Sequence, residues 1–197
     1  MANRRLSRMH QFLQEVEASV LLTDVRGFLA LTASLSPVEL GAALSSFYAH
    51  TGNVVERHGG RVVKFVGDGL LGAFVGMGDH RERALAALGE LDAHRDQWLA
   101  DNAKVGLPRL DYAAAVASGS MVAGELGTDQ IRFWDVLGAP VNLVFGLCRL
   151  AKERSLHHLI DEATVKTAKP GPPTVEVEPV ELGGKVHRLY RLITPAV

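Results

Sequence analysis

VLLTDVRGF, the stretch Val20–Phe28, is an apolar run that leads directly into an aspartate and, three residues later, a glycine. The run KFVGD at Lys64–Asp68 ends in the same residue types, and Gly69 follows it. Apolar runs bounded by Asp and Gly predict buried strands. Carboxylates at strand ends beside glycine can hold a hard divalent cation while backbone N–H groups face a phosphate. Together with DVLGAPVN at Asp135–Asn142, these stretches indicate metal-assisted attack at a nucleotide phosphate.

Taken singly, the two carboxylates have simpler explanations. Gly67–Gly69 alone would be a hairpin turn, because Asp and Gly serve turns for backbone reasons. Asp24 alone could cap a loop at the end of its strand. Two carboxylates at adjacent strand ends, however, suit a pair of Mg²⁺ ions, because Mg²⁺ takes few carboxylates and completes its shell with water and phosphate oxygens.

Composition limits the class of protein. The chain has 197 residues and predicts one domain with a single core. Its net charge of -1 offers no basic footprint, so nucleic acid is not an expected partner. The one cysteine, Cys148, is compatible with a reducing compartment, and no apolar run is long enough to span a bilayer. We therefore expect a cytoplasmic protein without a membrane partner.

The N-terminal segment, residues 1–17, predicts a helix that precedes a domain at 18–197. Four apolar residues recur there at helical spacing: Leu6, Met9, Phe12 and Leu13. The basic start of the chain lacks the apolar region of a signal peptide. A helix packed on the domain or on a partner copy is favoured over a membrane anchor.

The hydrophobic pattern predicts an α+β fold, a ferredoxin-like βαββαβ sheet with helices on one face and extra C-terminal strands. Glycines at 119 and at 124–127 are expected to be turns. The predicted elements are strand 18–24, helix 36–58, strands 61–66 and 70–75, helix 79–102, strands 110–117 and 131–136, helix 140–152, strand 156–160, helix 161–167, and strands 174–182 and 186–192.

These motifs resemble those of the class III nucleotide cyclases, which convert ATP or GTP to the cyclic nucleotide and pyrophosphate. The resemblance runs from about Val20 to Leu192, with family-like order and spacing. It rests on DVRGF at 24–28, RHGG at 57–60, KFVGD at 64–68, GELG at 124–127 and GAPVN at 138–142. It implies the class III cyclase fold for the domain at 18–197.

The resemblance implies roles for the residues of the first motifs. Asp24 and Asp68 match the two carboxylates that bind two metal ions, Mg²⁺ or Mn²⁺. The loop whose backbone contacts the phosphates matches Val25, Arg26, Gly27 and Phe28.

Further along the chain, Lys64 and Asp135 match the pair that reads the purine, and Asn142 matches a residue that orients the ribose in the transition state. In the family the metals come from one subunit, whereas the purine readers and the Asn come from the other. The resemblance therefore implies a homodimer with its sites at the interface and ATP as the substrate.

The purine pair also has a chemical logic of its own. A carboxylate accepts a hydrogen bond from the exocyclic amine of adenine, and an ammonium donates to its ring nitrogen. Guanine reverses both groups, so Asp135 and Lys64 would face unpaired partners and reject it. The alternative is a surface ion pair that contributes little.

Two positions depart from the family pattern. Where the family places an Arg four residues after the Asn, this chain has Gly146, and Arg149 lies about one helical turn further along, ~5 Å by helical rise. Where many relatives carry a phosphate-neutralising Lys, this chain has Gly183, with Lys185 two positions away. Arg149 and Lys185 are the candidates to replace the missing charges. Loss of a transition-state cation can cost ~10³ to 10⁵ in rate.

The resulting expectation is a homodimeric class III adenylate cyclase domain without a fused sensor, weak because of Gly146. The alternative is a catalytically silent relative that keeps the dimer as a regulatory or nucleotide-binding module. A guanylate cyclase is disfavoured by the purine pair.

Overall fold

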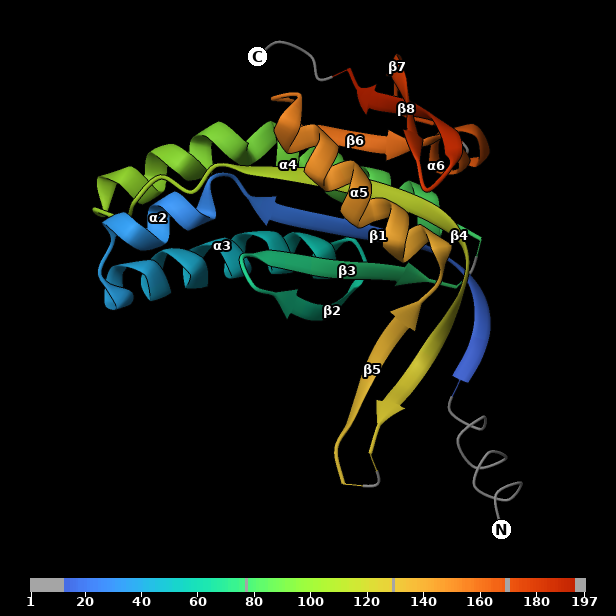
Figure 1. Cartoon of the computed structure of the whole chain (residues 1–197), viewed down its shortest axis with the longest axis horizontal. Coiled ribbons are helices and arrows are strands. Elements are labelled where there is room, and N and C mark those ends of the chain that lie inside the picture. The colour runs from blue at the N-terminus through green and yellow to red at the C-terminus, as the bar shows by residue number, and fades with distance from the viewer. Residues whose placement is uncertain (1–12, 77, 129, 169–170, 194–197) are drawn as a thin grey trace.

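The computed structural model describes residues 13–76, 78–128, 130–168 and 171–193 (Figure 1). The elements follow the chain in this order: β1 (Leu13–Val25), α2 (Phe28–Ser34), α3 (Pro37–Arg57), β2 (Arg61–Val66), β3 (Gly69–Val75), α4 (His80–Lys104), β4 (Tyr112–Gly127), β5 (Arg132–Leu137), α5 (Ala139–Glu153), β6 (His158–Asp161), α6 (Glu162–Thr167), β7 (Thr174–Leu182) and β8 (Lys185–Leu192).

One sheet organises the fold, with strand order β2-β3-β1-β4-β6-β8-β7 and with β5 paired to β4 off this path. Strand β1 pairs antiparallel with both β3 and β4, while β4 and β6 are parallel. The first part of the chain, β1-α3-β2-β3-α4-β4, is the predicted ferredoxin-like βαββαβ core, and β6 to β8 are the predicted extra strands. The predicted fold class is confirmed.

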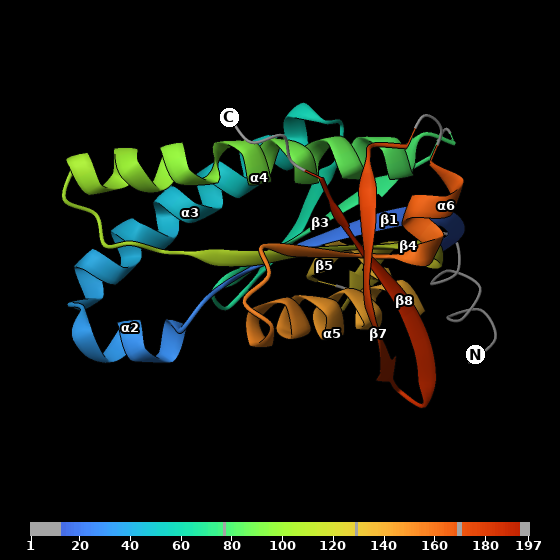
Figure 2. The ribbon, with the colours of Figure 1, turned by 90° about the horizontal axis from the view of Figure 1, so that it is seen from above.

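The helices of the core lie on one face of the sheet, and α5 lies on the other (Figure 2). Successive side chains of a strand point to opposite faces of the sheet, so β1 packs against helices on both sides. Leu21 packs in the cluster that contains Leu88 of α4. Leu22 packs instead with Leu147 of α5. The two core helices therefore share one face as predicted, and α5 adds a layer on the opposite side.

Helix α3 begins as the sequence predicts. The Ser36 hydroxyl accepts from the Glu39 N–H, and the Glu39 carboxylate accepts from the Ser36 N–H, which forms a capping box with Pro37 at the first position. The short helix α2, between β1 and α3, was not predicted.

Two predicted boundaries are wrong. Residues 13–17, expected to be helical, form the first part of β1, with Leu13 opposite Gly124 of β4. The rest of the predicted N-terminal helix lies outside the described residues. Strand β4 also continues through Gly119 and Gly124, which were expected to be turns. Strand β4 continues because β1 pairs with it over residues 112–124 and β5 over residues 122–127. A Cβ at Gly119 would lie only 3.2 Å from Pro140 Cγ at the start of α5. That glycine permits close packing and not a turn.

Candidate active site

Two carboxylates lie close together where β1 ends and β3 begins. Asp24 lies next to the last residue of β1 and pairs with Gly69, the first residue of β3. Asp68 occupies the turn just before Gly69, and its carbonyl accepts from the Val25 N–H at 3.2 Å. Register and turn thus bring together the two acids that the sequence predicts as metal ligands.

The electrostatics of this pair fit a divalent cation. Partial burial raises the pKa of Asp68, and the neighbouring Asp24 carboxylate raises it further. Like charges held close disfavour ionisation, and a bound cation would reverse that effect. Among the described residues no group of three or more His, Cys, Asp and Glu side chains is placed to hold a metal. Ions at Asp24 and Asp68 would therefore need water and substrate oxygens to complete their shells, as Mg²⁺ prefers.

The turn that carries Asp68 is held from the side by α3. Gly67 has φ +58°, a left-handed conformation that favours glycine. The Tyr48 hydroxyl donates to the Gly67 carbonyl, and the Tyr48 ring lies 4.4 Å from that of Phe65. Sequence analysis missed Tyr48, because nothing local links it to a turn nineteen residues away.

In the predicted phosphate loop, the Arg26 side chain points into the protein. Its guanidinium donates to the Lys152 carbonyl at 3.2 Å and to the Leu156 carbonyl, and it pairs with Asp111 at 3.4 Å. The loop can therefore offer only backbone groups to a phosphate. Gly27, with φ +62°, starts α2, whose first N–H groups have no partner within the helix.

A lysine that sequence analysis missed contacts Asp24, one of the two predicted metal ligands. Lys152, in the last turn of α5, places Nζ 2.6 Å from Asp24 Oδ2. Both side chains are mostly buried, with 29% of Lys152 and 27% of Asp24 exposed. The two residues are 128 positions apart, so no sequence pattern could pair them.

The predicted purine readers also come together. Lys64 Nζ lies 2.6 Å from Asp135 Oδ2, which joins β2 to β5. Lys64 follows an irregularity in the β2–β3 register, of the kind that re-aims a side chain. Beside this pair the Arg61 guanidinium stacks 4.5 Å from the Trp134 ring centre. Lys64 is 41% exposed, so the pair is open to solvent.

Asn142 lies in a separate pocket of about 540 Å³ at the other end of α5. The pocket also contains both departures from the family pattern, Gly146 and Gly183, together with the candidate cation Lys185. Its lining residues are Ser118, Ala139, Pro140, Asn142, Leu143, Gly146, Leu182, Gly183, Lys185 and His187. Arg149 is not among them; its side chain is 69% exposed and lies 3.7 Å from Glu153.

The Asn142 pocket and the carboxylate pair are separated along α5. Lys152, which touches Asp24, comes ten residues after Asn142 on the same helix. Ten residues correspond to about 15 Å along a helix axis. Asn142 and the Lys152–Asp24 contact therefore lie at opposite ends of α5.

Exposed apolar side chains lie on three elements that carry predicted site residues. The β4–β5 hairpin projects from the body of the sheet (Figure 1). The exposed apolar residues on the hairpin, on β2 and on α5 are Phe65, Val66, Val122, Phe133, Leu137 and Phe145.

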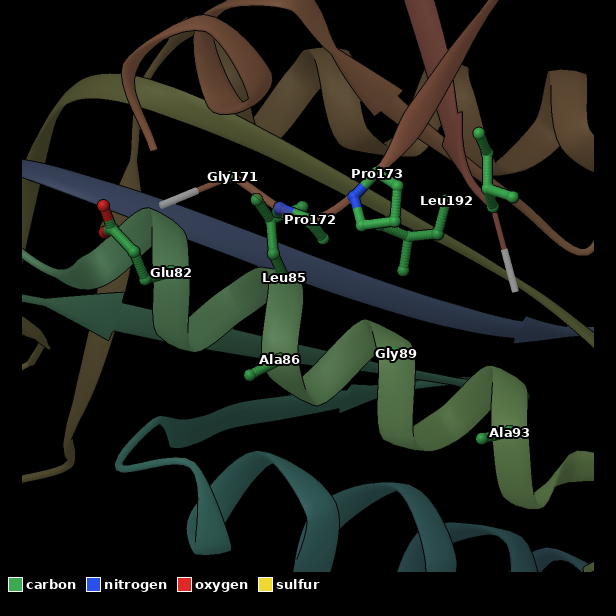
Figure 3. Close-up of a pocket in the computed structure, with 10 residues that line it drawn as sticks. Glu82, Leu85, Ala86, Gly89, Ala93, Gly171, Pro172, Pro173 and Leu192 are labelled. Carbon is green, nitrogen blue, oxygen red and sulfur yellow. The ribbon is translucent and has the colours of Figure 1, made fainter. Parts of the chain in front are cut away.

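A second cavity of about 540 Å³ lies on the opposite side of the sheet (Figure 3). It runs along α4 beneath residues 171–173. Among the described residues that line it, Glu82 is the only ionisable one. It contains none of the predicted site residues.

Comparison with known proteins identifies the family of the chain. The model of the adenylate and guanylate cyclase catalytic domain matches residues 11–192. An adenylate cyclase of Anabaena cylindrica is 27% identical over 150 residues, which cover 75% of this chain and 30% of that protein. An uncharacterized protein of Mycobacterium tuberculosis is 31% identical over 159 residues, which cover 79% of this chain and 28% of that protein.

Solved structures agree on the fold. A guanylyl cyclase superposes with a TM-score of 0.80 at 23% identity, covering 91% of this chain and 92% of its own. The adenylyl cyclase CyaB from P. aeruginosa superposes with a TM-score of 0.75 at 22% identity, covering 92% and 95%.

The chain belongs to the class III adenylate and guanylate cyclase catalytic domain family. It spans about 30% of the length of the curated relatives named above. No helix in the described part of the chain is long and apolar enough to cross a membrane.

Proposed function

We propose that this chain is an adenylate cyclase, which forms cyclic AMP and pyrophosphate from ATP at sites shared between two copies. One observation carries the proposal. Asp24 and Asp68 converge at one edge of the sheet, while Asn142 faces a pocket about 15 Å away along α5. Such half-sites are complete only when a second copy supplies the missing half.

Asp24 and Asp68 would hold the divalent ions, Mg²⁺ or Mn²⁺. When bound, two such ions supply positive charge to the attacking 3′-oxygen and to the departing pyrophosphate. The backbone N–H groups at the start of α2 would face the phosphates, because Arg26 is engaged inside the protein.

Lys64 and Asp135 would select adenine. The Lys64 ammonium and the Asp135 carboxylate lie 2.6 Å apart, so the edge of one base could contact both in place of the ion pair. The carboxylate would accept from the exocyclic amine, and the ammonium would donate to the ring nitrogen.

Lys185 would supply positive charge in the Asn142 pocket. It lines that pocket with Gly146, where the family has its arginine, whereas Arg149 faces solvent beside Glu153. A flexible ammonium stabilises a phosphate less well than a bidentate guanidinium, so we expect weak turnover. His187 lines the same pocket and is a further donor.

A homodimer would form through the exposed apolar residues of the β4–β5 hairpin, β2 and α5. A cytoplasmic location, where ATP and Mg²⁺ are both available, completes the proposal.

A second candidate function is a catalytically silent dimeric module. Two observations favour it: Gly146 offers no side chain to the Asn142 pocket, and Lys152 already pairs with Asp24.

The test is cyclic-nucleotide formation by the purified chain with Mn²⁺ and either ATP or GTP, followed by mass spectrometry. We expect cyclic AMP from ATP, no product from Asp68→Asn, and unchanged turnover in Asp101→Asn, whose carboxylate lies on the exposed end of α4. ATP binding without product above the Asp68→Asn background would favour the silent module.

A further inference from the structure

Lys152 contacts Asp24, one of the two proposed metal-site carboxylates, and has no place in the proposed reaction. Its Nζ lies 2.6 Å from Asp24 Oδ2, within ion-pair distance. It therefore sits where the positive charge of a metal ion would act.

The contact is held from both sides. Helix α5 packs on β1 and β4 through buried residues, among them Cys148, whose thiol contacts the Ala113 carbonyl at 3.5 Å. Ala113 is the β4 partner of Asp24, so this part of α5 lies level with the carboxylate. The Lys152 backbone carbonyl accepts from Arg26 at 3.2 Å, which fixes the end of the helix.

The pair is also shielded from water. Exposed lysine–carboxylate pairs contribute little, because water and salt screen them. Here less than a third of either side chain is exposed, so the attraction is stronger. A cation that approaches Asp24 must compete with an ammonium already in place.

Because the structure pairs Lys152 with Asp24 at the strand edge where Asp68 also lies, we propose that Lys152 is a built-in competitor of the divalent metal. Its ammonium offsets the charge of Asp24 in the metal-free protein and moves away from this carboxylate when the ion binds. Lys152 thus sets the metal concentration that the protein requires. The inference rests on the proposed metal site at Asp24 and Asp68, and it goes beyond that site by assigning a residue that opposes occupancy.

The test measures binding of Mn²⁺ alone to the nucleotide-free protein, through the electron paramagnetic resonance signal of free Mn²⁺. Lys152→Met keeps the length of the side chain and removes the charge. We expect it to bind Mn²⁺ at least about tenfold more tightly than the wild type, which corresponds to ~1.4 kcal/mol. Lys152→Gln, a polar replacement, should show the same direction and covers the case in which Lys152→Met folds poorly.

Lys166→Met is the matched control, because Lys166 forms an ion pair with Glu162 on the surface of α6. It should leave Mn²⁺ affinity within about twofold of the wild type, as screened surface charges do. Equal affinity in Lys152→Met and the wild type overturns the inference, and so does an equal gain in Lys166→Met.

Asp68→Asn separates the inference from the function on which it rests. If this variant weakens Mn²⁺ binding while Lys152→Met has no effect, the metal site stands and the role of Lys152 is refuted. If Asp68→Asn leaves binding unchanged, the metal site itself is refuted, and the inference with it.

Discussion

The Lys152 ammonium lies 2.6 Å from the Asp24 carboxylate, and this contact fixes one end of α5 at the strand edge that carries both acids. Asn142 lies near the other end of the same helix, about 15 Å away by helical rise. The helix therefore separates the two halves of the proposed site, which we propose are completed by a second copy.

Complementation between inactive chains tests this separation. Asp24→Ala and Asn142→Ala should each be inactive, and a mixture should regain activity because one site of a mixed dimer collects both intact halves. Random exchange in an equal mixture predicts about a quarter of wild-type turnover, since half of the dimers are mixed and each has one good site. The measurement is cyclic AMP formation after subunit exchange.

The matched control mixes Asp24→Ala with Asp68→Ala. Both lesions lie in the same half of the site, so no site in the mixed dimer is intact. Recovery in this control as well would show that the sites are not divided as proposed.

Base selection tests the Lys64–Asp135 pair. Lys64→Glu with Asp135→Ala removes the adenine pattern and offers an acceptor to the ring N–H of guanine. We expect ATP turnover to collapse and the ratio of cyclic GMP to cyclic AMP to rise, because a site loses discrimination when its polar partners change. Arg61→Gln, which removes the neighbouring stack on Trp134, should keep the original preference. A double variant with unchanged preference would mean that the pair does not contact the base.

Restoring the family's arginine tests Gly146. We expect Gly146→Arg to raise cyclic AMP formation at least about tenfold, equivalent to ~1.4 kcal/mol of barrier. The new Cβ would lie 3.3 Å from Leu182 Cδ1, so the Leu182 side chain must shift by a few tenths of an ångström. Gly146→Ala is the control, because it makes the same contact and gains helix propensity without a charge. An equal gain in both variants would assign the effect to helix stability.

Lys185 and Arg149 are the two candidates to replace the positive charge that is missing at Gly146, and their variants should behave differently. Lys185 lines the Asn142 pocket, and Arg149 does not. Lys185→Gln should lower kcat at least about tenfold, as removal of a single stabilising group at a developing charge does. Arg149→Gln should leave kcat within about twofold, because a surface ion pair contributes little. A large loss of kcat in Arg149→Gln with little change in Lys185→Gln would assign the stabilising charge to Arg149 instead.

Stability should depend on pH through His50. Burial, followed by the positive charge of Arg57, lowers the pKa of His50 from its ordinary 6.5 to about 4. Between these pH values the unfolded chain binds a proton that the folded chain does not, so stability rises with pH across this window. Urea denaturation at pH 7, 6 and 5 should therefore give decreasing stability.

His50→Phe is the variant that checks this assignment. The His50 ring stacks on Trp98 with centroids 4.6 Å apart, and Phe keeps the ring while removing the titration. The decrease in stability toward pH 5 should be smaller in His50→Phe than in the wild type. An identical slope in the two proteins would assign the pH dependence to other groups.

Much of this fold could be predicted from the sequence because the deciding signals are local. Alternating and continuous apolar runs predicted β2 and β3, and the Ser36–Glu39 box predicted the start of α3. The position of Asp68 in a tight Asp-Gly turn also follows from neighbouring residues alone. The local pattern was wrong at Gly119, because this glycine, which would permit a turn, lies inside β4 opposite Ala18 of β1.

Tertiary structure alone decided what the side chains of the site do. Arg26, in the predicted phosphate loop, turns inward to Asp111 and the end of α5, because packing places carbonyl and carboxylate acceptors there. Lys152 meets Asp24 across 128 positions, because α5 packs against β1. Sequence spacing carries the periodicity of a helix or a strand but not the distance between two elements. The elements and the two acids were therefore visible in the sequence, whereas the charge that faces Asp24 emerged only when the elements packed together.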